Sequence, residues 1–171
     1  MKKVAVFGKP GSGKSTVSKA LALSNGLPLH QLDSIVYKPN GELVAREVFD
    51  AAHNDILSSE SWVIDGFGPI SSFNERLAAA DTLVYINLPY SVSYWFVTKR
   101  CLKGFFIKPE GWPEGSSILK GTLNSYKTLK LCPKFWNDEF LSKLMEYSSS
   151  KKVYIIKTVS ELNDFALAQV R

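Results

Sequence analysis

The sequence is short of cysteine, of histidine and of long hydrophobic runs, and each shortage excludes a class of protein. Its two cysteines, Cys101 and Cys132, are far apart and its two histidines are isolated, so the clustered spacing of a zinc site is missing. No stretch approaches the roughly 18 consecutive apolar residues of a membrane span. The chain enters a strand-like run directly after Lys2-Lys3, without the apolar segment of a signal peptide. We therefore expect reduced thiols, no membrane association and a cytoplasmic location.

Acidic residues are scarce in one segment. The chain carries a net charge of +5, and residues 99–134 hold eight lysines and arginines against two glutamates. That segment therefore carries +6 and the rest of the chain −1. A basic segment of this kind suits a phosphate-rich ligand, either a nucleotide or a nucleic-acid backbone, although a solvated lysine-rich face also fits the pattern.

A glycine-rich motif stands near the beginning of the chain. Residues 8–15 read GKPGSGKS, directly after the apolar run 4–7 and before a helical pattern. The glycines permit turns that aim main-chain amides inward, and the helix adds its positive end to this anion cradle. Lys14 is then placed to reach the β- and γ-phosphates and the Ser15 hydroxyl to ligate magnesium, whereas a chance glycine-rich turn is the alternative. The predicted ATP and magnesium site comprises Gly8, Pro10, Gly11, Ser12, Gly13, Lys14, Ser15 and Thr16.

Short apolar runs alternate with helical patterns along the chain. This alternation predicts an α/β fold with a parallel sheet and right-handed crossovers. With 171 residues and 45% hydrophobic content, the chain suffices for one core and is too short for two ordinary domains, so we expect a single domain over residues 1–171. The expected strands lie at Val4–Phe7, Leu29–Leu32, Trp62–Ile64, Leu83–Leu88 and Val153–Ile156.

Three helix starts have capping residues. Ser72 with Glu75 fits a capping box, Asn137 precedes an amphipathic stripe, and Ser160 precedes Glu161 and an apolar pattern. We expect helices to begin at these positions.

A segment rich in glycine and proline, residues 104–117, interrupts the rhythm and is followed by the helix-like spacing of Leu119, Leu123 and Tyr126. We predict a lid insertion over about residues 103–136, because hinged basic segments close over phosphates in phosphoryl-transfer enzymes. A solvated helix face is the alternative. The lysines that fall near one stripe of the expected helix are Lys120, Lys127, Lys130 and Lys134.

Two aspartates follow expected strands. Asp65 ends the run Trp62–Ile64, and we assign it to the magnesium side of the triphosphate, with a loop cap as the alternative. Asp33 ends the second strand and faces the same edge, because the carboxyl ends of the strands form the ligand crevice of an open α/β sheet. Asp33 is a candidate to accept a proton from a substrate hydroxyl or to orient the acceptor, and a structural turn aspartate is the alternative.

The phosphate loop, Asp33, the Asp65-Gly66-Phe67 element, Arg76 and Lys99-Arg100 together resemble the adenylate kinase-like branch of P-loop kinases. The segment Asp65-Gly66-Phe67-Gly68-Pro69 is similar to the family's DGFPR segment but lacks the arginine after proline, which counts against adenosine monophosphate recognition. The overall arrangement is closer to the topology modulation (FlaR-like) group.

This resemblance implies a three-layer P-loop NTPase fold with five parallel strands ordered 2-3-1-4-5 in chain numbering. It also implies that Arg76 lies near the acceptor and Arg100 at the base of the lid, where guanidinium groups grip phosphate oxygens. An exposed helix position for Arg76 and a helix-terminal cation for Arg100 are the alternatives. The resulting catalytic candidates are Lys14, Asp33, Asp65, Arg76 and Arg100, and the metal candidates are Ser15 and Asp65.

The sequence therefore predicts an ATP-dependent kinase that transfers the γ-phosphoryl group to a small acceptor. The acceptor is left open among nucleoside monophosphates, nucleosides and hydroxyl metabolites, because pocket shape sets this specificity. An ATPase-like regulator acting on DNA and a nucleotide sensor without chemistry are the rival hypotheses. We expect a monomer or a homodimer.

Overall fold

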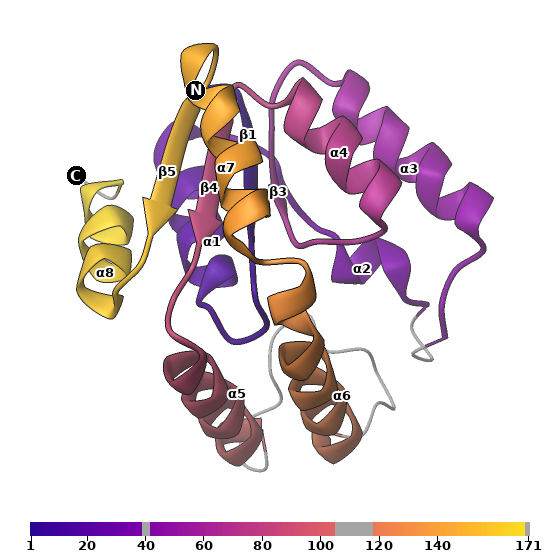
Figure 1. Cartoon of the computed structure of the whole chain (residues 1–171). Helices are drawn as coiled ribbons and strands as arrows, with labels where there is room; N and C mark the ends of the chain where they lie inside the picture. The colour runs from indigo at the N-terminus through magenta and orange to yellow at the C-terminus, as the bar shows by residue number, and fades with distance from the viewer. Residues whose placement is uncertain (39–41, 105–117, 170–171) are drawn as a thin grey trace.

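The structure is a computed structural model that describes residues 1–38, 42–104 and 118–169. Strands and helices alternate along the chain (Figure 1). The strands are β1 (Lys3–Gly8), β2 (Leu29–Gln31), β3 (Trp62–Asp65), β4 (Thr82–Ile86) and β5 (Lys152–Ile156). The helices are α1 (Lys14–Asn25), α2 (Asp33–Val36), α3 (Arg46–Ser58), α4 (Ile70–Ala79), α5 (Tyr90–Gly104), α6 (Ile118–Leu131), α7 (Asp138–Glu146) and α8 (Val159–Ala168), with 3-10 turns η1 (Cys132–Lys134) and η2 (Tyr147–Ser149).

The five strands form one parallel sheet in the order β2-β3-β1-β4-β5, which confirms the predicted fold class and strand order. Val6 of β1 is in register with Asp65 of β3, and Gln31 of β2 is in register with the same aspartate. All strands run the same way, so their carboxyl ends meet at one edge. The phosphate loop after β1 therefore lies beside the ends of β2 and β3.

Alternate side chains of each strand enter two different cores. Val4 and Val6 pack with α1 and α8 on one face, while Ala5 and Phe7 pack with α3, α4 and α7 on the other. A strand that is buried on both faces has consecutive apolar residues instead of alternating apolar and polar ones. The buried residues of β1 follow this pattern. The helices on the two faces give the three layers seen in Figure 1.

Aromatic rings fill the core beneath the loop. Trp136 stacks on Tyr85 with ring centroids 5.2 Å apart, and Phe7 stacks on Tyr85 at 5.6 Å. Phe73 and Phe140 meet the Phe7 ring edge-on. Such pairs add to the free energy gained by burying their area, so Trp136 anchors the segment after η1 to the sheet.

The helices α5 and α6 lie beyond the carboxyl ends of the strands and pack against each other (Figure 1). A short hydrogen bond of 2.7 Å joins Thr98 Oγ1 and the Tyr126 hydroxyl between them. The helix α6 confirms the predicted helical spacing. The glycine- and proline-rich part of the predicted lid, with Phe105, Phe106 and Trp112, lies outside the described residues.

One predicted helix start is right and two are wrong. Asn137 caps α7, because its side chain accepts a hydrogen bond of 2.9 Å from Phe140 N. Thr158, and not Ser160, caps α8 by accepting from Glu161 N. Ser72 lies inside α4, which begins after Pro69, and its hydroxyl donates to Asp50 on α3.

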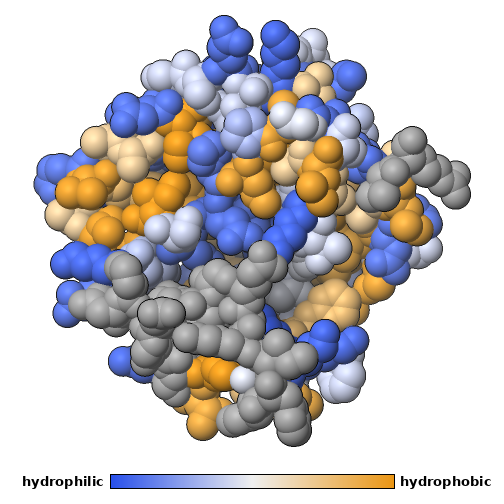
Figure 2. Space-filling view, turned by 180° about the vertical axis from the view of Figure 1, so that it is seen from behind, coloured by the Kyte–Doolittle hydropathy of each residue, from blue (hydrophilic) through white to orange (hydrophobic). Residues whose placement is uncertain are grey.

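Among residues 1–38, 42–104 and 118–169, no helix is long and apolar enough to span a bilayer. Figure 2 shows hydrophilic residues interleaved with apolar patches on the face seen from behind.

Candidate functional site

The phosphate loop has the strained close packing that only glycine permits. Gly11 has φ of 68°, and a Cβ there would lie 2.5 Å from the Ser93 carbonyl oxygen. Gly13 has φ of 86°, and a Cβ there would lie 2.7 Å from Leu162 Cδ2. Gly13 caps α1 without a side-chain hydrogen bond, so the first amides of the helix face the loop. Such a glycine-lined turn at a helix N-terminus is suited to an anion.

Lys14 curls back over this loop. Its Nζ donates a hydrogen bond of 2.9 Å to the Lys9 carbonyl oxygen. Burial lowers the pKa of Lys14, the carboxylates of Asp65 and Asp33 oppose this shift, and Arg100 adds to it. These four charged groups, predicted from separate parts of the sequence, are therefore within electrostatic reach of one another.

Ser15 and Asp65 meet directly. Ser15 Oγ donates a hydrogen bond of 2.8 Å to Asp65 Oδ2, because the β1–β3 register sets the end of β3 beside the first turn of α1. Asp65 is 6% exposed, and its Oδ1 has no hydrogen-bond partner. Burial raises the pKa of the Asp65 carboxyl, and Lys14 and the Ser15 hydroxyl oppose this shift.

This pair fits a magnesium ion in its chemistry. Magnesium prefers hard oxygen ligands and usually takes one or two from the protein, with phosphate oxygens and waters completing its shell. Ser15 and Asp65 supply a hydroxyl and a carboxylate with an unpaired oxygen. Over the described ranges, no group of three His, Cys, Asp or Glu side chains could hold a metal ion. A magnesium ion bound to Ser15 and Asp65 would therefore take its remaining ligands from the phosphate oxygens of a bound triphosphate and from water.

Asp33 and Arg100 border the same edge. Asp33 begins α2 and is exposed, and the Leu32 amide before it donates to the Asp65 carbonyl at 2.9 Å. Arg100 on α5 donates through Nη2 to Ser125 Oγ on α6 at 3.0 Å. Burial lowers the pKa of Arg100, and the Asp33 carboxylate opposes this shift. Asp33 on α2 and Arg100 on α5 thus both lie within electrostatic reach of Lys14.

Arg76 differs from the other candidates, because its side chain is fully buried. Its Nη2 donates to the carbonyl oxygens of Gly66 and Phe67, at 3.2 and 2.6 Å, and its Nη1 lies 3.4 Å from His53 Nε2. Burial lowers the pKa of Arg76 to about 10, against the opposing effect of Asp65. The guanidinium therefore fixes the main chain of Gly66 and Phe67, directly after Asp65, by hydrogen bonds to their carbonyl oxygens.

The sequence contained a signal for this burial. Phe73, Arg76, Leu77 and Ala80 have the i, i+3, i+4, i+7 spacing of a buried helix face, and all four are buried. The position of Arg76 on this apolar face indicates burial, whereas its charge suggests contact with a ligand.

Lys9 is a functional candidate that the sequence did not indicate. It occupies a variable position of the phosphate motif but is 1% exposed. Its Nζ donates a hydrogen bond of 2.7 Å to Asn87 Oδ1 and lies 4.5 Å from the centre of the Tyr90 ring. Burial lowers the pKa of Lys9, and Cys132 opposes this shift while Lys14 adds to it. A second buried cation thus lies at the phosphate loop.

No protein-family model matches the chain, and no curated protein matches it in sequence. Solved structures do match its fold. Shikimate kinase from Acinetobacter baumannii in complex with shikimate has a TM-score of 0.61 at 20% identity, over 99% of this chain and 91% of that one. Shikimate kinase from Bacteroides thetaiotaomicron has a TM-score of 0.56 at 15% identity, over 96% and 94%. A gluconokinase from Sinorhizobium meliloti 1021 has a TM-score of 0.50 at 19% identity, over 99% and 91%.

The chain therefore has the fold of P-loop kinases. The closer resemblance to topology modulation proteins finds no support in these comparisons and stays a prediction.

Proposed function

We propose that the protein is an ATP-dependent phosphotransferase that moves the γ-phosphoryl group of magnesium-ATP to a hydroxyl of a small acceptor, with residues 1–171 acting as one catalytic unit. The observation that carries this proposal is the hydrogen bond between Ser15 and Asp65 beside Lys14. It joins the glycine loop to a carboxylate on the neighbouring strand, as a kinase site requires.

Each side chain has a distinct task in this proposal. The loop amides and Lys14 bind and orient the triphosphate. Magnesium, held on the side of Ser15 and Asp65, would neutralise charge on the phosphate oxygens. Arg100 stabilises charge on the transferred group from the side of α5 and α6.

On the acceptor side, Asp33 accepts the proton of the acceptor hydroxyl. Its carboxylate receives no hydrogen bond within the described ranges and is exposed at the end of β2, so an acceptor can reach it. Arg76 acts indirectly, because its contacts with Gly66 and Phe67 hold the turn that follows Asp65.

The test is a product screen by mass spectrometry with magnesium-ATP and candidate acceptors, beside an acceptor-free hydrolysis control. The names of the structural neighbours supply shikimate and gluconate as two trial acceptors, to be joined by nucleosides, nucleoside monophosphates and neutral polyols. We expect a phosphorylated product that depends on acceptor and is reduced at least about 100-fold in Lys14→Ala. Unchanged turnover in that variant would remove the role given to Lys14.

A DNA-acting regulator is the second candidate, favoured by the composition of α5 and α6. Neither helix contains an acidic residue, and Lys99, Lys103, Lys120, Lys127 and Lys130 are all exposed on them. Binding of duplex DNA through these lysines must weaken steeply with salt. Absence of duplex binding at low salt contradicts this candidate.

A further inference from the structure

The acceptor side of the molecule is acidic. Residues 29–80, which form β2, β3, α2, α3 and α4, contain eight aspartates and glutamates against three lysines and arginines. The segment 99–134, which contains the C-terminal end of α5 and all of α6, has the opposite balance. The two sides of the phosphate loop therefore differ in charge, and only the α5–α6 side is suited to bind phosphate.

The three cations of residues 29–80 are already engaged. Arg76 is fully buried and its guanidinium contacts main-chain carbonyls and His53. The Arg46 Nε lies 2.8 and 2.7 Å from the two carboxylate oxygens of Asp50, and its Nη2 donates to Ser71. The guanidinium groups of Arg46 and Arg76 are therefore occupied by protein acceptors and are not available to bind a ligand phosphate or carboxylate with two hydrogen bonds.

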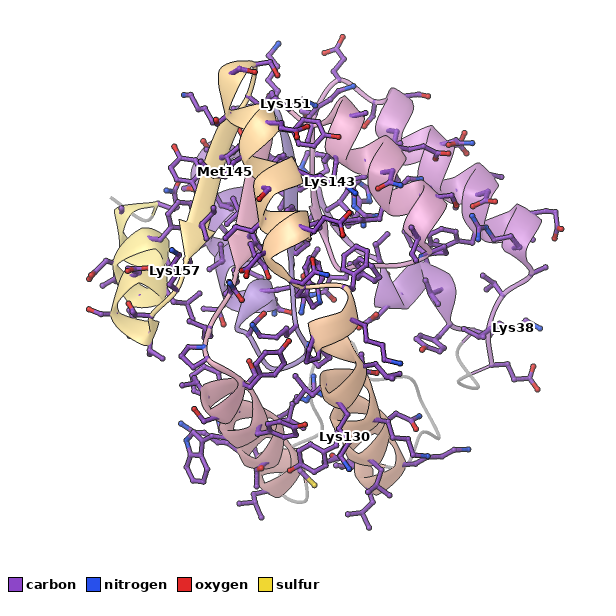
Figure 3. All side chains as sticks on the ribbon, in the orientation of Figure 1. Lys38, Lys130, Lys143, Met145, Lys151 and Lys157 are labelled. Carbon is purple, nitrogen blue, oxygen red and sulfur yellow. The ribbon has the colours of Figure 1, made fainter. Side chains whose placement is uncertain are left out.

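Lys38, the third cation, follows the C-cap of α2 and lies at the outer edge of the molecule (Figure 3). Its Nζ is 3.6 Å from Glu42 Oε2. Within the described residues, an acceptor phosphate or carboxylate at Asp33 would therefore find no cation from residues 29–80, and the cations that do reach Asp33 are Lys14 and Arg100, which the proposed function assigns to the triphosphate.

One aromatic residue of the acceptor side, Phe67, lies just after β3, where its ring packs against Phe73, Phe135 and Trp136. Gln31 pairs with Asp65 in the sheet, and the chain continues from this pair to Asp33 after β2 and to Phe67 after β3. The Phe67 ring is half-buried and lies 4.7 Å from the Phe135 ring, centre to centre. A carboxylate and an aromatic ring thus emerge from neighbouring strand ends.

We infer that the acceptor is an uncharged hydroxyl compound with an apolar ring face, such as a nucleoside or a neutral cyclic polyol, and not a nucleotide or a carboxylate sugar. Its hydroxyl meets Asp33 and its ring face meets Phe67. This inference rests on the proposed kinase activity and deepens it, because it names the class of acceptor. A monophosphate or carboxylate would bring its charge to Asp33 and Asp65, where the cations within reach among the described residues, Lys14 and Arg100, are the ones that the triphosphate uses.

The experiment compares neutral with charged acceptors: adenosine and cytidine are each paired with their own monophosphate, and neutral inositol is compared with the carboxylates shikimate and gluconate. We expect kcat/KM to be at least about 100-fold higher for the neutral member of the productive pair, because like charges within a few ångströms repel strongly in a poorly hydrated site. A higher value for the charged member overturns the inference and leaves the kinase proposal intact.

A binding measurement decides the case in which no acceptor gives product. Diadenosine pentaphosphate offers the acceptor side an anionic group attached to a nucleotide. By calorimetry we expect it to bind within about tenfold of ATP, since its second half meets an acidic surface. Binding more than about 100-fold tighter than ATP overturns the inference, and a protein that does not bind ATP at all removes both this inference and the proposed function.

Two charge-neutralising variants complete the test. Asp33→Asn should tighten diadenosine pentaphosphate about fivefold by removing the nearest repulsive charge. Asp55→Asn, an exposed change on α3, should leave its affinity unchanged. If both variants change the affinity equally, or if Asp33→Asn does not change it, the Asp33 carboxylate does not repel an anionic acceptor, which contradicts the inference.

Discussion

The Ser15 hydroxyl donates a hydrogen bond of 2.8 Å to Asp65 Oδ2, although the two residues are 50 positions apart in the chain. The bond joins the first turn of α1 to the end of β3 across the phosphate loop. The parallel β1–β3 register brings them together, so a motif in one strand–helix unit and a carboxylate in the next form one site. The other oxygen of Asp65 has no partner, which leaves it available to a cation.

The variant Asp65→Asn tests this pair. The amide keeps the shape but loses the charge that holds a magnesium ion, so turnover of magnesium-ATP should fall at least about 100-fold. ATP affinity in EDTA should change less than about threefold, because the loop and Lys14 bind the phosphates without the carboxylate. Titration calorimetry with and without magnesium measures both, and Asp55→Asn is the matched control. An equal loss of affinity in EDTA would assign Asp65 to phosphate binding or folding.

Arg76 makes a prediction about stability. Arg76→Met removes the buried guanidinium and leaves the partly buried Gly66 and Phe67 carbonyls without this donor, so the free energy of unfolding should fall by about 3 kcal/mol. Arg46→Met removes an ion pair in which both side chains are 39 to 49% exposed, and should lower the free energy of unfolding far less than Arg76→Met does. Urea unfolding of both variants measures the difference. Similar losses would mean that the buried contacts of Arg76 contribute little.

Periodicity and motif spacing were enough to predict the sheet, the loop and the meeting of Ser15, Asp33 and Asp65 at one edge. The reason is geometric: parallel strands bring all their carboxyl ends to the same side, so residues at strand ends need no further information to be placed. The order of the strands came from the family resemblance, because chain order alone does not specify it.

Side-chain burial was harder to predict where charge and pattern disagree. Lys9 stands at a position that the phosphate motif leaves open, so only the contacts with Asn87 and Tyr90 reveal its burial. The α8 start was misplaced for a different reason. Glu161 was paired with the adjacent Ser160, whereas Thr158 has the three-residue spacing of a capping box. The Lys157 amide also donates a hydrogen bond of 2.7 Å to Glu161 Oε2.

Lys9→Met separates a phosphate-binding role of Lys9 from a structural one. Within the described ranges, the ammonium of Lys9 contacts Asn87 and the Tyr90 ring, and no carboxylate pairs with it. The buried charge therefore disfavours the empty protein and favours a bound polyphosphate. Methionine should keep or raise the free energy of unfolding while weakening ATP binding about tenfold.

Thermal unfolding and ATP calorimetry measure these two effects on the same sample of Lys9→Met. Lys143→Met, which removes an exposed lysine paired with Glu139 on α7 (Figure 3), is the control and should change neither. A destabilised Lys9→Met protein with unaltered ATP affinity would show that Lys9 only supports the fold.

His53 predicts how stability depends on pH. It is fully buried between α3 and α4, and burial, with help from Arg76, lowers its pKa to about 4 from 6.5. Asp50 opposes the shift, and Glu75 Oε2 lies 3.9 Å from its Nδ1. Because the unfolded chain binds a proton on this histidine near pH 6.5 and the folded one only near pH 4, its contribution to stability is complete above pH 6.5 and is lost as the pH falls toward 4.

The variant His53→Gln removes this titration and keeps a side chain that can accept from Arg76. Urea unfolding at pH 7 and at pH 4.5 should show that the natural protein loses about 2 kcal/mol more than His53→Gln over this range. The comparison cancels the carboxylates that titrate in both proteins. Equal losses in the two proteins would mean that the folded state protonates His53 as readily as the unfolded chain does, against the burial and the Arg76 contact that hold its pKa down.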